Sequence, residues 1–170
     1  MLLLYTCRAT PILADFVCEV YWQRYAAGSQ AVTKADVRSF IRRAVGRGRT
    51  TTRWSESTII RVSNGLLGIC ADYGLLGPLR AGARTIVPFR ITPITTSVLA
   101  HDLHFRGLGD HAVVHHADWG LFGLAPTDVL QELKRLALHG EIIVQAAAAI
   151  IDIGWKYKSI EELAHVLAEG

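Results

Sequence analysis

The fold is decided by residues 33–74, which read TKADVRSFIRRAVGRGRTTTRWSESTIIRVSNGLLGICADYG. Thr33 and Asp36 have the spacing of a capping box, with Asp in place of the usual Glu, and predict a helix from residue 34 to about residue 45. The apolar residues of this helix recur three or four positions apart, so they share one face, which is expected to be buried. They are Val37, Phe40, Ile41 and Ala44.

A second helix is predicted after a basic loop, GRGRTTTR, at residues 46–53. Ser55 is placed to cap this helix, and Gly74 stands where a left-handed residue commonly ends one. Between them, apolar residues recur with a period of 3.6, as expected for a helix with one buried face. They are Ile59, Val62, Leu66, Ile69, Cys70 and Tyr73.

Helical patterns also dominate the rest of the chain. Capping residues, prolines at first helical positions and closing glycines predict further helices over about 11–27, 93–106, 111–116, 126–138 and 160–168. Apolar and polar residues alternate only weakly over 84–91, and this stretch contains Pro88, so it is at best a short edge strand. Residues 141–155 are mostly apolar on all sides, which fits either a buried helix or a hairpin, and their β-branched pairs favour the hairpin.

These elements predict a mainly α protein: a small helical bundle with helix-turn-helix or winged-helix-like elements and one or two short β-hairpins. The order helix, turn, helix, hairpin fits the chain twice, in residues 37–91 and in residues 126–154. Two subdomains are expected: a basic helical one over 1–92 with the helix-turn-helix-like segment, and an acidic helical one over 93–170 with a winged-helix-like C-terminal part. Helix should exceed strand at least about threefold.

Composition indicates a folded, cytoplasmic protein. Of the 170 residues, 51% are apolar and 19% charged, which is too hydrophobic for a disordered chain. The longest apolar run, Ala146–Ile151, is far shorter than the roughly 18 residues of a membrane span, and the N-terminus lacks the basic stretch of a signal peptide. Cys7, Cys18 and Cys70 form an odd set without C-x-x-C spacing, so neither a disulfide framework nor a zinc ribbon is expected.

Charge is divided unevenly along the chain, whose net charge is only +3. Residues 1–90 hold 13 basic and 5 acidic residues, a balance of +8, whereas residues 91–170 hold 5 and 10, a balance of −5. This division is typical of nucleic-acid contact, and arginine, which prevails here, suits phosphate well; a solvated helix face is the alternative. The candidate nucleic-acid contacts are Lys34, Arg38, Arg42, Arg43, Arg47, Arg49, Arg53, Arg61 and Asn64.

Enzyme signatures are absent from the sequence, which has no P-loop, dinucleotide-binding, nucleophile-elbow or H-E-x-x-H motif. Five of the seven histidines lie between His101 and His116, and the spacing of His111 and His115 can place two imidazoles around a metal. Because residues 1–100 contain no histidine, ordinary surface or core histidines are favoured over a metal site. We expect no catalytic residue, no metal and no other cofactor.

The basic loop also carries an aromatic residue, Trp54, directly after Arg53. A tryptophan at the boundary of an element is ordinarily a packing anchor. Its place among basic residues also allows it to stack on an unpaired base.

Several short sequence strings follow one another along the chain in a characteristic order. They are RWSEST at 53–58, RV at 61–62, GLL at 65–67, DYGLL at 72–76, DLH at 102–104, HADW at 116–119, LF at 121–122, IDIGW at 151–155 and YKSIEE at 157–162. Together they resemble the BrxA family, a small component of bacteriophage exclusion (BREX) defence systems. The resemblance covers nearly the whole chain, from about Pro11 to Glu162.

The resemblance implies a mostly helical protein of helix-turn-helix or winged-helix character that binds DNA and works with other defence subunits. It implies no catalytic residues. Family members usually have extra residues ahead of the helix that begins at Pro11, so we expect this chain to lack an N-terminal piece. A second departure is the hairpin turn, which reads Ala146-Ala-Ala-Ala149 where glycine is expected.

The leading hypothesis is a non-enzymatic accessory factor of phage defence that binds double-stranded DNA, mainly through phosphates, with no membrane and no small-molecule substrate. Arg61 and Asn64 are candidates for contacts to base edges if their helix enters a major groove. A protein–protein adaptor that docks a basic partner through the acidic half is the second hypothesis. A metal-dependent hydrolase built on the histidines is the third.

Overall fold

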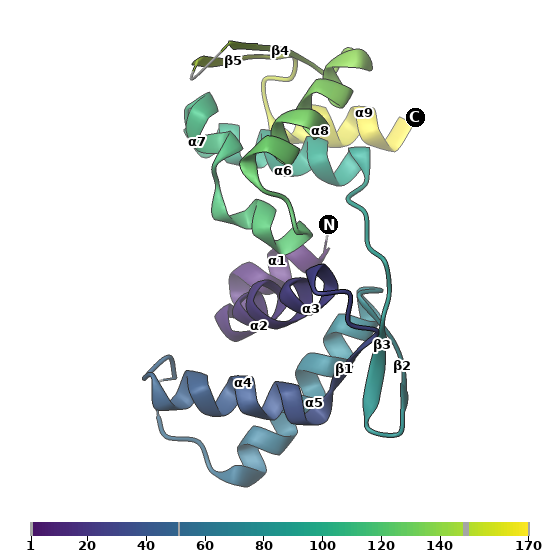
Figure 1. Cartoon of the computed structure of the whole chain (residues 1–170). Helices are drawn as coiled ribbons and strands as arrows, with labels where there is room; N and C mark the ends of the chain where they lie inside the picture. The colour runs from purple at the N-terminus through teal and green to yellow at the C-terminus, as the bar shows by residue number, and fades with distance from the viewer. Residues whose placement is uncertain (1, 51, 148–149, 170) are drawn as a thin grey trace. The chain divides into compact units, whose positions relative to one another are not determined.

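The computed structural model describes residues 2–50, 52–147 and 150–169 (Figure 1). The chain divides into two compact units, Leu2–Phe89 and Arg90–Gly170, which we call the N-terminal unit and the C-terminal unit. The expected boundary lay three residues further along, after residue 92. Helix prevails over strand, and the strands form two small antiparallel sheets, so the predicted mainly α class with short hairpins is confirmed.

The N-terminal unit begins with a run of helical segments that the sequence predicted only in part. Helix α2 (Pro11–Phe16), a π-helical turn (Val17–Tyr21) and α3 (Trp22–Ala26) follow one another without a break. Gly28, with φ of +72°, comes next, so the predicted helix over 11–27 is confirmed in extent, with an unpredicted π-helical middle. The preceding helix, α1 (Leu2–Ala9), was not predicted.

Helices α4 (Lys34–Gly46) and α5 (Glu56–Asp72) form where their capping residues predicted them. The Thr33 hydroxyl accepts from the Asp36 amide while the Asp36 carboxylate accepts from the Thr33 amide, so both halves of the capping box are present. Ser55 accepts from the backbone amide three residues later. The two helices pack against each other through apolar faces. The predicted stripe of α4 is buried in full, namely Val37, Phe40, Ile41 and Ala44. On α5 the predicted Ile59, Leu66 and Cys70 are buried together with the unpredicted Leu67, whereas the predicted Val62, Ile69 and Tyr73 are only half-buried.

A three-stranded antiparallel sheet completes this unit, in the order β1 (Ala31–Thr33), β3 (Ala83–Ile86), β2 (Leu76–Arg80). The prediction that residues 84–91 form at best an edge strand was wrong, because β3 is the central strand. Pro88 lies beyond the end of β3, so its missing N–H removes no bond from the ladder. The short strand β1 was not predicted at all.

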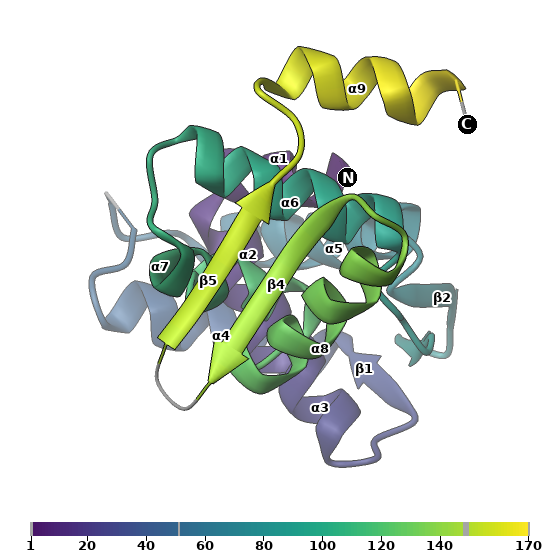
Figure 2. The same cartoon turned by 90° about the horizontal axis from the view of Figure 1, so that it is seen from above.

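The C-terminal unit is built from helices and a hairpin that lies over one side of them (Figure 2). The hairpin predicted for residues 141–155 is confirmed: β4 and β5 pair in antiparallel register from Ile142 opposite Trp155 to Ala147 opposite Ile150. Its expected turn includes residues 148 and 149, which lie outside the described residues. The elements are α6 (Pro93–Phe105), α7 (Asp110–Val114), a 3₁₀ helix (Ala117–Phe122), α8 (Pro126–Leu138), β4 (Ile142–Ala147), β5 (Ile150–Trp155) and α9 (Ile160–Glu169).

The hairpin is fastened to α7 by one carboxylate. Asp110 accepts a hydrogen bond from the Ile153 backbone amide at 2.9 Å and another from the Trp155 indole Nε1 at 3.1 Å. The Trp155 ring also stacks on His104, with ring centroids 4.3 Å apart. These contacts set the position of β5 on the helices of its unit.

None of the helices in the described ranges is long and apolar enough to cross a membrane. Cys7, Cys18 and Cys70 form no disulfide within the part of the chain that the structure describes, and Cys7 and Cys70 are buried. Burial raises the pKa of Cys70 to about 12, so this thiol is protonated at neutral pH.

Candidate nucleic-acid interface

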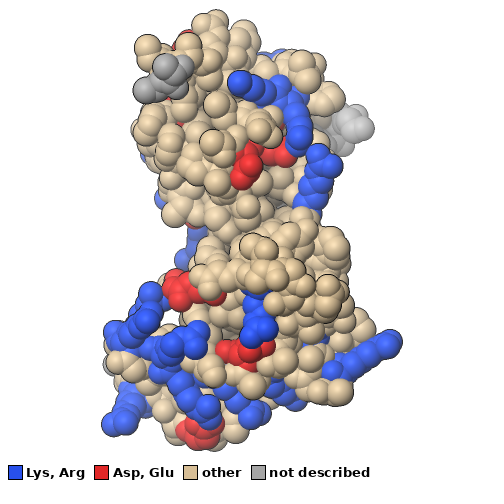
Figure 3. Space-filling model, viewed as in Figure 1, with Lys and Arg blue, Asp and Glu red and all other residues tan. Residues whose placement is uncertain are grey.

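The nine residues predicted to contact nucleic acid all lie in the N-terminal unit. Figure 3 shows Lys and Arg side chains gathered over the end of α4 and the loop that follows it. Lys34, Arg38, Arg42 and Arg43 belong to α4, Arg47, Arg49 and Arg53 to the loop, and Arg61 and Asn64 to α5.

Some of these cations have no acidic partner within the described ranges of the chain. Arg43, Arg47, Arg53 and Arg61 are exposed, and no carboxylate among the described residues pairs with any of them. An unpaired exposed guanidinium presents its full charge and its fork of donors to solvent. These four residues, which we call the free arginines, can therefore receive phosphate oxygens without first breaking an ion pair.

Other arginines of the predicted set hold the loop in place. Arg42 pairs with Glu56 across the two ends of the loop. Arg49 reaches back to Glu19 at 2.5 Å and Asp15 at 3.2 Å, and the hydrogen bond and charge of Glu19 raise the pKa of Arg49. The sequence signal did not separate these structural arginines from the free ones.

Lys34 and Arg38 are half-buried and so are less open to a ligand than the free arginines. The Lys34 amide donates to the Gly82 carbonyl at 3.0 Å, which joins the start of α4 to the turn between β2 and β3. The Arg38 Nε is buried and meets no partner among the described residues.

One face of helix α5 carries two glycines and therefore has little side-chain bulk. Arg61 and Asn64 lie on it one turn apart, together with Gly65 and Gly68. A Cβ added at either glycine would meet nothing within 4 Å. Another molecule can therefore approach the backbone of α5 closely along the side that carries Arg61.

Sequence reasoning missed two arginines on the β2–β3 hairpin. Arg80 is exposed beside the two-residue turn, and Arg84 donates to the Gly77 carbonyl at 2.8 Å. The turn residues Ala81 and Gly82 have φ of +48° and +80°, as a type I′ turn requires. The available signal was a small-residue turn, Ala-Gly, between residues able to pair as strands.

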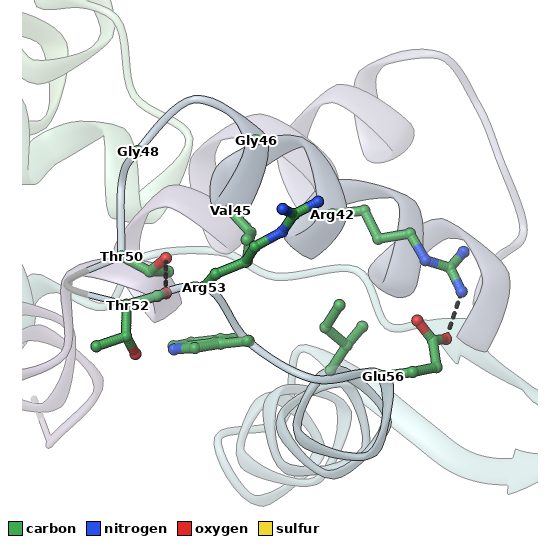
Figure 4. Close-up of a pocket in the computed structure, with 10 residues that line it drawn as sticks. Arg42, Val45, Gly46, Gly48, Thr50, Thr52, Arg53 and Glu56 are labelled. Carbon is green, nitrogen blue, oxygen red and sulfur yellow. Dashed lines mark hydrogen bonds and ion pairs between the residues drawn. The ribbon is translucent and has the colours of Figure 1, made fainter.

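The loop between α4 and α5 borders a hollow of about 600 Å³ (Figure 4). Val45 and the buried Ile59 give it an apolar side, and the Thr50 hydroxyl donates to the Thr52 carbonyl at 2.8 Å on the other. We call it the Trp54 hollow, and it is lined by Arg42, Val45, Gly46, Gly48, Thr50, Thr52, Arg53, Trp54, Glu56 and Ile59.

The histidines of the C-terminal unit are not arranged as a metal centre. Within the described ranges no group of three His, Cys, Asp or Glu residues could hold an ion. His111 and His115 stack with ring centroids 4.0 Å apart, and His115 Nδ1 donates to the His111 carbonyl at 2.9 Å. His101 is fully buried, with Nδ1 2.8 Å from the Ser97 carbonyl.

Comparison with known proteins gives one positive result. No curated protein and no solved structure matches the chain. A sequence profile of the BrxA family matches residues 1–102, which is more than half of the 170 residues and includes the whole N-terminal unit. By this match, and in agreement with the resemblance of its sequence strings, the chain belongs to the BrxA family.

Proposed function

We propose that the protein is a non-enzymatic component of a BREX phage-defence system that binds double-stranded DNA in the cytoplasm, alongside other defence subunits. Family membership supports the role in defence. The single observation that favours DNA is the set of free arginines, Arg43, Arg47, Arg53 and Arg61, on the unit with the basic charge balance. Phosphate contacts of this kind bind duplex DNA with little dependence on its sequence.

The order of elements in the N-terminal unit supports a winged-helix mode of binding. Helices α2–α3, strand β1, helices α4 and α5 and the β2–β3 hairpin follow one another, and β1 pairs with β3. In such an arrangement α5 is the helix that enters a major groove, and the hairpin contacts the flanking backbone. Arg61 and Asn64 would then meet base edges, and Arg80 a phosphate.

The test is a fluorescence-anisotropy titration of a 20-base-pair duplex at several salt concentrations. If four to six cations meet phosphates, log affinity against log salt should have a slope of about −4 to −5, from roughly −0.9 per phosphate. Exchanging both Arg43 and Arg47 for Glu should abolish retention above low salt and leave the helix content unchanged, because neither side chain is buried.

The matched control exchanges Lys134 and Lys158 for Glu, which changes the charge by the same amount on exposed positions of the C-terminal unit. This variant should bind like the unmodified protein. If it is the variant that fails, the DNA-binding surface lies on the C-terminal unit and our assignment of the site is wrong.

An adaptor role is the second candidate function, and the excess of acidic residues in the C-terminal half favours it. An acidic surface attracts a basic partner subunit and raises its association rate. Absence of duplex binding even at low salt would remove the DNA-binding proposal and leave the adaptor role.

A further inference from the structure

We propose that the Trp54 hollow binds one unpaired nucleotide of a DNA strand, with the base stacked on Trp54 and its phosphate on Arg53. The inference rests on the proposed DNA binding and adds a preference for DNA that is not fully paired. The hollow measures about 600 Å³, within the range of roughly 300–1,000 Å³ that small-molecule sites occupy.

Trp54 differs from the other tryptophans in having no ring or hydrogen-bond partner among the described residues. Trp22 and Trp155 pack edge or face against neighbouring aromatic rings, and the buried Trp119 donates from Nε1 to a backbone carbonyl at 2.7 Å. Trp54 is half-buried and has neither a ring contact nor a hydrogen bond among the described residues. An indole that packs on no ring and borders a hollow can offer a face for stacking on a base.

The polar groups around the hollow suit the rest of a nucleotide. Figure 4 shows Arg42 joined to Glu56 by an ion pair, whereas the Arg53 guanidinium carries no such bond. Arg53 is thus available for a phosphate, and the Thr52 side chain, which has no partner among the described residues, for a sugar or base edge. Val45 and Ile59 add apolar surface on which a base can rest.

Stacking on Trp54 favours an unpaired nucleotide over a base pair. In a duplex both faces of each internal base are stacked, so an indole can reach a base only at an end, a bulge or a single-stranded segment. The hollow lies between α4 and α5, whose exposed arginines hold the duplex in the proposed function. A strand that continues beyond the bound duplex can therefore place its first unpaired nucleotide in the hollow.

The experiment compares three probes at one salt concentration: a blunt 20-base-pair duplex, the same duplex with a four-nucleotide overhang, and free dAMP. The unmodified protein should bind the overhang duplex about 5- to 100-fold more tightly than the blunt one, as expected from the stacking of one base on an aromatic side chain. Trp54→Ala should remove this gain and keep the blunt affinity within about twofold, whereas Trp54→Phe should retain most of it.

Trp22→Phe is the matched control, since it changes a tryptophan of the same unit that already has ring partners, and it should preserve the gain. A measurement that needs no alanine variant is the tryptophan emission, which the overhang should quench more than the blunt duplex does. Trp54→Phe should abolish that difference.

The outcomes separate this inference from the proposed function. If the unmodified protein does not bind the blunt duplex, the proposed function is contradicted. Blunt binding without a gain from the overhang, or a gain that survives in Trp54→Ala, would overturn the nucleotide site alone. Quenching by free dAMP without any gain from the overhang would also overturn it, because the ligand would then be a free nucleotide.

Discussion

The turn between β2 and β3 is strained at Ala81. Its φ of +48° lies in the left-handed region, which costs an L-residue with a Cβ about 1–2 kcal/mol relative to the right-handed conformation. Asparagine tolerates this conformation better and is preferred before glycine in type I′ turns. We expect Ala81→Asn to raise the free energy of unfolding by about 0.5–1 kcal/mol, measured as an increased urea midpoint at an unchanged slope.

Ala81→Val is the opposing control, since a β-branched side chain is disfavoured at positive φ and should destabilise the protein. Midpoints that move in the same direction for both variants would contradict the strained turn.

His101 makes the stability of the C-terminal unit depend on pH. Burial lowers the pKa of His101 below its ordinary value of about 6.5, against smaller upward effects of its bond to Ser97 and the charge of Glu141, while His104 adds to the lowering. Below pH about 6.5 the unfolded chain therefore binds a proton that the folded chain does not. Stability should fall as the pH decreases through this range, by at most ~1.4 kcal/mol per pH unit from this group.

His101→Leu should flatten this dependence, because it replaces the titrating group with an apolar side chain that can fill the same place in the core. His111→Gln, at an exposed position, should preserve it. Urea unfolding at pH 5, 6 and 7 provides the measurement. If the free energy of unfolding changes equally with pH in His101→Leu and in the unmodified protein, the dependence belongs to other groups.

The helices and strands that could be predicted from the sequence are those determined by residues close to one another in the chain. The capping box of α4 involves Thr33 and Asp36, three positions apart, and its prediction was confirmed. Strand β1 has only three residues and exists because it pairs with β3, about fifty positions later. No local pattern marks such a strand, and for the same reason the central place of β3 could not be predicted.

The contribution of Asp110 to the attachment of the hairpin to α7 can be measured. The Asp110 carboxylate accepts two hydrogen bonds from β5, and hydrogen bonds to carboxylates contribute about 1.5–3 kcal/mol each. Because two such bonds are lost, we expect Asp110→Ala to destabilise the C-terminal unit by about 3 kcal/mol, the low end of their sum, and to speed hydrogen exchange at the Ile153 amide. Asp110→Asn, which keeps one acceptor oxygen, should have a smaller effect.

Asp152 provides the control on the same strand, since it is exposed and makes no side-chain bond within the described residues. Asp152→Ala should leave the exchange rate of Ile153 unchanged. An equal acceleration in both variants would indicate a general effect of lost negative charge instead of a lost attachment.

The sequence could indicate which half of the chain carries the basic surface but not which arginines are free. The surplus of arginine over residues 34–61 is a property of composition. The pairing of Arg49 with Asp15 and Glu19 joins residues 34 and 30 positions apart, so it depends on how the helices pack. The Trp54 hollow likewise forms only when the ends of α4 and α5 come together.

Because the chain divides into two compact units, we expect the proposed DNA binding to be separable from the C-terminal unit. Residues 1–89 hold 12 basic and 5 acidic residues, a balance of +7, and residues 90–170 hold 6 and 10, a balance of −4. Each unit has large buried side chains of its own, such as Phe16 and Phe40 in the first and Trp119 and Leu133 in the second. Expressed separately, both fragments should therefore be helical by circular dichroism. Because counterion release depends on the cations that meet phosphates, fragment 1–89 should retain duplex binding with the salt slope of the full chain, and fragment 90–170 should show none. A folded fragment 1–89 that fails to bind, or binding by fragment 90–170, would show that the free arginines are not the surface that holds DNA.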